Sequence, residues 1–208
     1  SASVYKPNAS RLLKETDDLL PLNPYGRTKL CIEQILGDLY DSDSRWRIAN
    51  LRYFNPVGSH SSGLLDENTK GKSSNLFPAI LKTIEGEQKQ LLIFGNDWPT
   101  PDGTCIRDFI HVMDLAEAHI ATLNYLNKND PQYISLNIGT GKGTSVLDVI
   151  KAFHRIEGVS FKYDFVERRL GDLPFLVADN QFALDLLSWA PKRNLLDMCY
   201  DSIKNRFL

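Results

Sequence analysis

The fold is decided by the stretch Arg47-Ile48-Ala49-Asn50-Leu51-Arg52-Tyr53-Phe54, which runs into Asn55-Pro56-Val57-Gly58. Its apolar residues predict a β-strand, and the Asn-Pro and Gly residues that follow predict that the strand breaks there. Ahead of this stretch, Asn23 can cap a helix and Pro24 suits the first helical position. Apolar residues then recur at helical spacing, which predicts a helix over about 24–40. A helix that leads into a strand of this kind is typical of α/β proteins.

The rest of the chain continues this alternation. Asp114 and Ser145 each precede an apolar helical pattern, and each is predicted to cap it. The first five residues are predicted to be the end of a strand, and the polar residues 59–75 a long loop. The pattern indicates a parallel or mixed sheet covered by helices. The expected helices are 76–85, 115–126, 146–156, 180–187 and 195–207, and the expected strands are 91–94, 105–112, 134–138 and 161–166.

The composition argues against several classes of protein. Lys and Arg number 24 and Asp and Glu number 26, which gives a net charge of -2 and no basic surplus for nucleic-acid binding. No apolar run approaches the ~20 residues of a membrane helix, and no secretory signal is recognised. Three cysteines lie far apart, which favours a reducing, cytoplasmic location over a disulfide framework. These cysteines are Cys31, Cys105 and Cys199.

The histidines do not indicate a metal site. They show neither the pairing at helical spacing nor the clustering with cysteine that metal sites need. His111 is expected on a strand and His119 on or beneath a helix surface. The full set is His60, His111, His119 and His154.

A tyrosine and a lysine four residues apart occur twice in the chain. Tyr25 and Lys29 stand in the first turns of the helix that begins at Pro24, whereas Tyr200 and Lys204 stand in the middle of the last helix. At this spacing the two side chains share a helix face, and a nearby cation favours the phenolate that a general base requires. The first pair can face a cleft, so it is the stronger candidate. Ser1 joins it, because a serine at the end of a strand lies where ligands bind α/β sheets.

Gly139-Thr140-Gly141-Lys142-Gly143 lies between a strand and a helix, as a phosphate-binding loop would. Its glycine spacing differs from that of a dinucleotide-binding loop, and no acidic residue follows at the distance that a ribose contact needs. A tight structural turn is therefore the favoured interpretation of this loop.

At this point the chain resembles a known family. Ser-Ala-x-Val-Tyr at the start, Asn-Pro-Tyr-Gly-x-x-Lys at 23–29 and Leu-Arg-Tyr-Phe-Asn-Pro-Val-Gly at 51–58 are the pattern of extended short-chain dehydrogenase/reductases. Later stretches resemble the UDP-glucose 4-epimerase family specifically, and the likeness covers essentially all 208 residues. These stretches are Ile93–Thr104, Ile106-Arg107-Asp108-Phe109-Ile110-His111-Val112, Asn137–Gly141 and Arg168-Arg169-Leu170-Gly171-Asp172.

The resemblance implies a fold, a cofactor and a reaction. The fold would be the C-terminal part of a Rossmann-like parallel sheet plus a small α/β UDP-sugar-binding domain. Residues 1–57, rejoined by about 114–141, would form the Rossmann side, and residues 58–113 and 142–208 the substrate-binding domain. With bound NAD, UDP-glucose and UDP-galactose would interconvert through a 4-keto intermediate. Another NAD-dependent nucleotide-sugar epimerase or dehydratase is the alternative, although a dehydratase would carry Asp-Glu where this chain has Ala2-Ser3.

The resemblance also assigns roles to single residues. Tyr25 would be the catalytic acid and base on the sugar 4-hydroxyl, with Ser1 relaying its proton. Lys29 would hold the nicotinamide ribose and lower the Tyr25 pKa, and Phe54 would lie against the nicotinamide. Leu176 stands where relatives carry a large Tyr or a small Cys, so it would set the size of the sugar pocket. The remaining substrate contacts would be Asn55, Asn75, Leu76, Leu92, Phe94, Arg107, Arg169 and Asp172.

One motif of the family is missing from this sequence. No Gly-x-x-Gly-x-x-Gly loop is present to hold the pyrophosphate of NAD. We therefore expect an incomplete chain that lacks the N-terminal NAD-binding half and is inactive alone. It could then be a non-catalytic fragment that binds UDP, whereas the complete enzyme would be a cytoplasmic homodimer.

Overall fold

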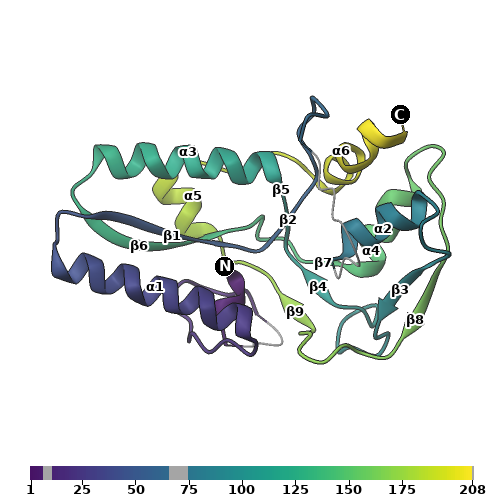
Figure 1. Cartoon of the computed structure of the whole chain (residues 1–208), viewed down its shortest axis with the longest axis horizontal. Helices are drawn as coiled ribbons and strands as arrows, with labels where there is room; N and C mark the ends of the chain where they lie inside the picture. Colours follow the sequence, from purple (N-terminus) through teal and green to yellow (C-terminus); the bar gives the residue numbers. More distant parts are fainter. Residues whose placement is uncertain (7–10, 66–74, 208) are drawn as a thin grey trace.

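The computed structural model describes residues 1–6, 11–65 and 75–207. Seven helical segments and nine strands alternate along these ranges (Figure 1). The helices are the 3-10 turn η1 (Ala2–Val4), α1 (Pro24–Ser42), α2 (Leu76–Ile84), α3 (Val112–Lys128), α4 (Val146–His154), α5 (Gln181–Leu187) and α6 (Leu195–Phe207). The strands are β1 (Arg47–Tyr53), β2 (Asn55–Val57), β3 (Leu91–Phe94), β4 (Ile106–Arg107), β5 (Phe109–His111), β6 (Gln132–Ile138), β7 (Thr144–Ser145), β8 (Tyr163–Val166) and β9 (Phe175–Leu176).

A parallel pair of long strands organises one end of the molecule. β1 pairs with β6 over seven residues, from Arg47 opposite Gln132 to Tyr53 opposite Ile138. Helices α1 and α3 lie on either side of this pair in Figure 1, and α5 packs on α3 and β6. The buried side chains between them include Ile110, Leu136 and Trp189. The predicted α/β fold with parallel strands is confirmed.

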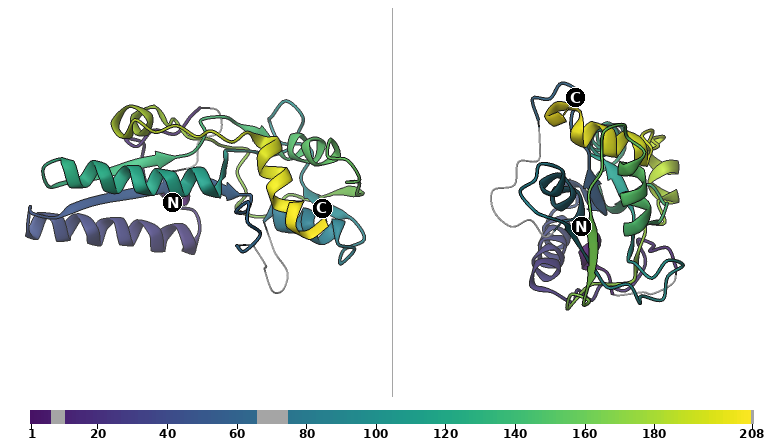
Figure 2. Two further views of the ribbon diagram at one scale, coloured as in Figure 1. Left: turned by 90° about the horizontal axis from the view of Figure 1, so that it is seen from above. Right: turned by 90° about the vertical axis from the view of Figure 1, so that its right-hand side faces the viewer.

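A second group of elements lies at the other end, where α2, α4, α6, β3 and β8 gather (Figures 1 and 2). β3 and β8 are parallel, and their apolar core is centred on Phe77, Ile80 and Phe153. The short strands β2, β4 and β5 connect the two groups, since β2 pairs with β5 and β4 pairs with both β7 and β9. A third apolar cluster packs Val4, near the start of the chain, with Leu13, Phe54 and Ala178.

Helix ends follow the capping chemistry that the sequence predicts, with one exception. The Asn23 side chain accepts a hydrogen bond from the Gly26 amide, and the Ser145 side chain accepts one from the Asp148 amide. Asp114, however, does not cap α3. His111 does so instead, because its Nδ1 accepts the Met113 amide at 3.0 Å and the helix begins at Val112.

Three strand predictions need correction. The predicted break at Asn55–Val57 is the short strand β2, because these residues pair with β5. The predicted strand over 105–112 is two strands, interrupted at Asp108, whose carboxylate turns to a neighbouring loop. Residues 2–4 form the 3-10 turn η1 instead of a strand end, with the Val4 amide bonded to the Ser1 carbonyl. Of the predicted loop 59–75, residues 66–74 lie outside the described residues.

A buried polar network joins α1 to the strand pair. The Arg52 guanidinium donates to both carboxylate oxygens of Glu33, at 2.7 Å for the shorter contact, and to the Tyr5 hydroxyl at 2.9 Å. The Tyr5 hydroxyl in turn donates to Asn137 on β6 at 2.6 Å. Burial raises the pKa of Tyr5 to about 12, so this hydroxyl stays protonated and acts as a donor. The network fixes α1, and with it the Tyr25 end of that helix, against β1.

Candidate functional site

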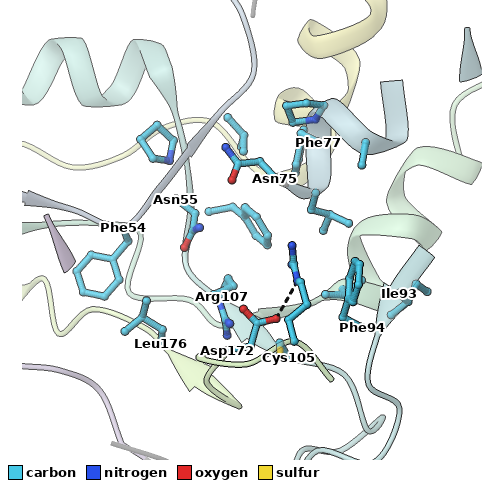
Figure 3. A pocket seen from close by; sticks show the side chains of 18 of the residues that line it. Phe54, Asn55, Asn75, Phe77, Ile93, Phe94, Cys105, Arg107, Asp172 and Leu176 are labelled. Atoms are coloured by element: carbon cyan, nitrogen blue, oxygen red, sulfur yellow. Dashed lines mark hydrogen bonds and ion pairs between the residues drawn. The ribbon is translucent and has the colours of Figure 1, made fainter. Parts of the chain in front are cut away.

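A cavity of about 1550 Å³ opens between the two groups of elements, and Figure 3 shows the side chains around it. Its walls come from η1, the first turn of α1, β1 and β2, the start of α2, β3, β4 and the segment 169–176. Twelve of the thirteen predicted site residues line it, although they are spread from Ser1 to Leu176. They are Ser1, Tyr25, Phe54, Asn55, Asn75, Leu76, Leu92, Phe94, Arg107, Arg169, Asp172 and Leu176.

The thirteenth residue, Lys29, stands one helical turn behind the cavity wall. Its ammonium lies 5.3 Å from the centre of the Tyr25 ring, within cation–π distance. Tyr25 itself is 58% exposed and opens onto the cavity. Lys204 lies 6.0 Å from the Tyr200 ring, so the second pair has nearly the same geometry, but neither Tyr200 nor Lys204 lines the cavity. The two Tyr-Lys pairs therefore have similar local geometry and differ in their position relative to the cavity.

Gly26 brings the Tyr25 turn close to Ser1 and Ser3. A Cβ atom at Gly26 would lie 2.3 Å from the Ser3 carbonyl oxygen and 2.7 Å from Pro21 Cβ, so no other residue fits there. The Ser1 and Ser3 hydroxyls lie 2.9 Å apart on the facing 3-10 turn. Tyr25 and Ser1 thus share one end of the cavity, as their predicted roles require.

Phe54, Asn55 and Leu176 form the wall beside this end. Phe54 follows β1 directly and is buried, with Leu176 next to it in Figure 3. The amide of Asn55 points into the cavity, and its side-chain oxygen is buried without a hydrogen-bond partner. A buried acceptor of this kind gains most from a ligand hydroxyl or amine.

Two arginines, Arg107 and Arg169, line the cavity. The Arg169 guanidinium stacks on the Phe94 ring at 4.2 Å, and its Nε donates to Asp172 at 3.3 Å, the dashed contact in Figure 3. Arg107 donates from Nη1 to the Ile106 and Leu173 carbonyls at 2.9 and 2.7 Å, which holds its guanidinium in place. Planar guanidiniums held in this way suit phosphate oxygens.

The neighbours of these arginines suit a flat ring. Leu92 and Phe94 alternate with Leu91 and Ile93 along β3, and the latter two are buried in the apolar core. Asn75 precedes α2 without capping it through its side chain, and Figure 3 shows it above Arg107. An aromatic face, a partly exposed leucine and two guanidiniums together form a surface for a base joined to phosphates.

The glycine-rich loop at 139–143 is a structural turn. The Asp108 carboxylate accepts the Thr140 amide at 2.7 Å and the Gly141 amide at 3.0 Å. Those amides are the ones that a phosphate-binding loop would turn toward its ligand. The loop therefore does not serve as a pyrophosphate cradle, as its glycine spacing predicted.

Several residues of the site were not predicted from the sequence. Phe77, Cys105 and Phe109 also line the cavity, and Asp108 is the buried residue between the lining residues Arg107 and Phe109. A single signal for Asp108 was present, namely an aspartate between the apolar residues of the predicted strand at 105–112. Within the described ranges no group of three or more His, Cys, Asp or Glu residues could hold a metal ion. In the same ranges no helix combines the length and apolar character needed to span a bilayer.

Comparison with known proteins agrees with this geometry. Residues 1–139 match the model of the NAD dependent epimerase/dehydratase family, which is more than half of the chain. The chain belongs to this family. Among its relatives, the UDP-glucose 4-epimerase of Bacillus subtilis (strain 168) is 45% identical over 202 residues, which cover 97% of this chain and 59% of that protein.

Two solved structures of family members superimpose closely on this chain. UDP-glucose-4-epimerase from Stenotrophomonas maltophila, with bound NAD and formylated UDP-arabinopyranose, has a TM-score of 0.94 at 44% identity, over 98% of this chain and 60% of that one. UDP-glucose 4-epimerase from Bifidobacterium longum, in complex with NAD+ and UDP, has a TM-score of 0.92 at 41% identity, over 99% and 61%. The chain thus spans about 60% of the length of these relatives.

Proposed function

We propose that this chain carries the UDP-hexose site and the proton-transfer residues of an NAD-dependent UDP-glucose 4-epimerase, an isomerase of galactose metabolism. The observation that supports this most strongly is the placing of Tyr25 on the same cavity as Phe54, Arg107, Arg169 and Asp172. A proton-transfer residue at one end and phosphate-binding residues at the other match a sugar joined to a nucleoside diphosphate.

The arginine end would hold UDP. Arg169 and Arg107 would donate to the diphosphate oxygens, and Asp172 would accept a hydrogen bond from the ribose. Leu92 and Phe94 would flank the uracil ring, with Asn75 and Leu76 contacting the UDP from the start of α2. These contacts are uniform in the ground and transition states, so they supply affinity more than rate.

The tyrosine end would hold the hexose. Tyr25 would accept the proton of the sugar 4-hydroxyl and return it from the same position, with Ser1 relaying it. Asn55 would accept a hydrogen bond from the sugar through its unpartnered side-chain oxygen. Leu176 would limit the space beside the sugar ring. The 4-keto sugar would need room to turn about its link to the phosphate, and the cavity is wide.

The described residues fit one end of NAD. Phe54 offers a flat face for the nicotinamide, and Lys29 stands behind Tyr25 to hold the adjoining ribose. NAD, when bound, supplies reversible hydride exchange with the sugar carbon. The described residues contain no Gly-x-x-Gly-x-x-Gly loop for its pyrophosphate. In the loop at 139–143, Asp108 occupies the amides of Thr140 and Gly141.

Conversion of UDP-galactose to UDP-glucose tests this proposal. The assay uses the chain in a full-length context that supplies NAD binding, with a coupled enzyme that oxidises only UDP-glucose. Turnover that depends on Tyr25 supports the proposal. Binding of UDP without turnover supports the second candidate, a non-catalytic UDP-binding role. The lack of a Gly-x-x-Gly-x-x-Gly loop among the 208 residues favours that role for this chain alone.

The organisation of the protein completes the proposal. The Rossmann side would consist of residues 1–57 with about 114–141, and the substrate-binding side of residues 58–113 with 142–208. Because α5 packs on α3 and β6, we add residues 181–189 to the Rossmann side. Exposed Ile32 and Ile35 on α1 support a homodimer formed through this helix. Cys31, Cys105 and Cys199 are free thiols, which supports a cytoplasmic location.

A further inference from the structure

Asp108 is a fully buried carboxylate for which the proposed chemistry has no use. It stands between β4 and β5, directly after Arg107, and its exposed fraction is 0%. No ion pair within the described ranges neutralises it. Four hydrogen-bond donors surround it instead: Oδ1 accepts the Thr140 amide and hydroxyl at 2.7 and 2.6 Å, and Oδ2 accepts the amides of Gly141 and Ala178 at 3.0 and 3.2 Å.

These donors fill the acceptor sites of the carboxylate. An ionised carboxylate offers about four lone-pair positions, so all of them are used. The fit is close as well, since a Cβ atom at Gly139 would lie 2.5 Å from Oδ2. Burial raises the pKa of Asp108, and the four donors act in the opposite direction by favouring its charged form.

The backbone of Asp108 reaches two further segments. Its amide donates to the Leu176 carbonyl at 3.1 Å, and its carbonyl accepts the Asn55 amide at 3.0 Å. One residue thus connects β2, the segment after β9 and the loop at 139–141. Asn55 and Leu176, which form the sugar end of the cavity, are the residues that it holds.

We propose that Asp108 is a positioning residue that sets the sugar end of the cavity by holding Asn55 and Leu176 in register. This inference rests on the proposed function, because the sugar end is defined by it. The UDP end has contacts of its own: Arg169 stacks on Phe94 and bonds to Asp172. Arg107 directly precedes Asp108, but its Nη1 is held by the carbonyls of Ile106 and Leu173 and not by the Asp108 carboxylate. Disturbing Asp108 should therefore weaken the recognition of the hexose and leave the recognition of UDP nearly unchanged.

Substitution by asparagine tests this selectively. In Asp108→Asn the side-chain oxygen can keep both Thr140 donors, but the new NH₂ group would face the amides of Gly141 and Ala178. Two donors then meet without an acceptor, and the segment after Leu176 has to move. Asp102→Asn is a matched control, because the Asp102 carboxylate accepts the Thr104 amide and hydroxyl and the Ser145 hydroxyl but does not line the cavity.

Calorimetry on the 208-residue chain gives the readout, with UDP and UDP-glucose as ligands and without NAD. In Asp108→Asn we expect the ratio of UDP-glucose affinity to UDP affinity to fall about fivefold or more, with UDP affinity changed by less than about threefold. In Asp102→Asn the ratio should stay within about twofold of the wild type. A purely structural role would lower both affinities together, and that outcome would overturn the proposal.

Two further outcomes are decisive. If the wild-type chain binds neither ligand, the proposed function fails and this inference fails with it. If UDP binds and Asp108→Asn keeps the wild-type ratio of UDP-glucose affinity to UDP affinity, the inference fails while the proposed function stands. Should Asp108→Asn not fold, Thr140→Val removes only the hydroxyl donor, and we expect a shift of about twofold in the same direction. No shift in that variant would likewise overturn the positioning role.

Discussion

At the scale of single residues, the two Tyr-x-x-x-Lys pairs show that spacing and local geometry do not define a site. Both lysines lie near their tyrosine ring, at 5.3 and 6.0 Å, and both tyrosines are substantially exposed. Tyr25 differs because Gly26 lets its helical turn approach Ser3, which brings the phenol to the cavity. Tyr200 stands on α6, away from that cavity.

This contrast predicts the effect of removing each hydroxyl. In a full-length context, Tyr25→Phe should lower kcat by about 10²–10⁴-fold, because a proton-transfer group is lost. UDP binding should change little, since the phenol acts in the transition state. Tyr200→Phe is the control and should keep kcat within about twofold of the wild type. Equal kcat values for the two variants would remove Tyr25 from its proposed role.

Leu176 carries the second prediction at this scale. It is smaller than Tyr and larger than Cys, and it stands beside Phe54 at the sugar end. Steric exclusion of this size is worth about 1–3 kcal/mol, so N-acetylated UDP-hexoses should be processed weakly by the full-length protein. Leu176→Tyr should abolish their turnover and spare UDP-galactose, whereas Leu176→Cys should raise it. A kcat/KM ratio that is unchanged across the three proteins would place Leu176 away from the sugar.

At the scale of elements, α1 depends on a buried ion pair. Arg52 and Glu33 are 4% and 7% exposed, and their contact joins the helix that carries Tyr25 to β1. An ion pair of this kind contributes little net stability relative to apolar residues, but removing one partner leaves a buried charge. The network thus controls the placing of α1 more than it drives folding.

Removal of the arginine tests this view of the pair. Arg52→Met should lower the free energy of unfolding by about 3–5 kcal/mol, measured by urea titration. Arg45→Met removes an arginine that pairs with Asp43 at the surface, where the Arg45 side chain is 88% exposed. That control should cost about 0–1 kcal/mol. Similar losses in the two variants would show that Glu33 is not left uncompensated.

His111 makes the start of α3 sensitive to pH. Its Nδ1 accepts the Met113 amide, so Nε2 carries the proton and donates to Asp201 at 3.2 Å, which is the neutral form. Burial lowers the pKa of His111 below its usual 6.5. In the window just below pH 6.5 the unfolded chain therefore binds more protons than the folded chain, and stability falls as the pH falls.

A cap that does not titrate should remove this dependence. His111→Asn keeps a side-chain acceptor for the helix start, so we expect a smaller loss of unfolding free energy between pH 7 and pH 5.5 than in the wild type. His60→Asn replaces a histidine in a surface turn and should retain the wild-type slope. The expectation fails if the slope is the same in all three proteins, as measured by urea titration at each pH.

At the scale of the whole molecule, the fold was largely predictable from the sequence and the site only in part. Periodicity and capping residues gave the helices and long strands, because these signals are local. Asp108 interrupts the strand at 105–112 because its carboxylate bonds to Thr140 and Gly141, which are distant in the chain. His111 caps α3 through the nearby Met113 amide, but its buried ring also contacts Asp201 on α6, which the local pattern does not indicate. The site residues came from family resemblance, and their meeting at one cavity depends on packing between the two groups of elements, which no short stretch encodes.

The most direct test of the account is a titration of the 208-residue chain with UDP, because the central claim is that this cavity is a UDP-hexose site. Arg169 and Arg168 are neighbours that face opposite ways: Arg169 lines the cavity, whereas Arg168 stacks on Trp98 at 4.1 Å and pairs with Asp97. The wild type should bind UDP, and Arg169→Ala should weaken binding about tenfold or more, because a charge-assisted contact to phosphate is lost. Arg168→Ala should stay within about threefold of the wild type. No binding of UDP, or equal losses in the two variants, would contradict the account.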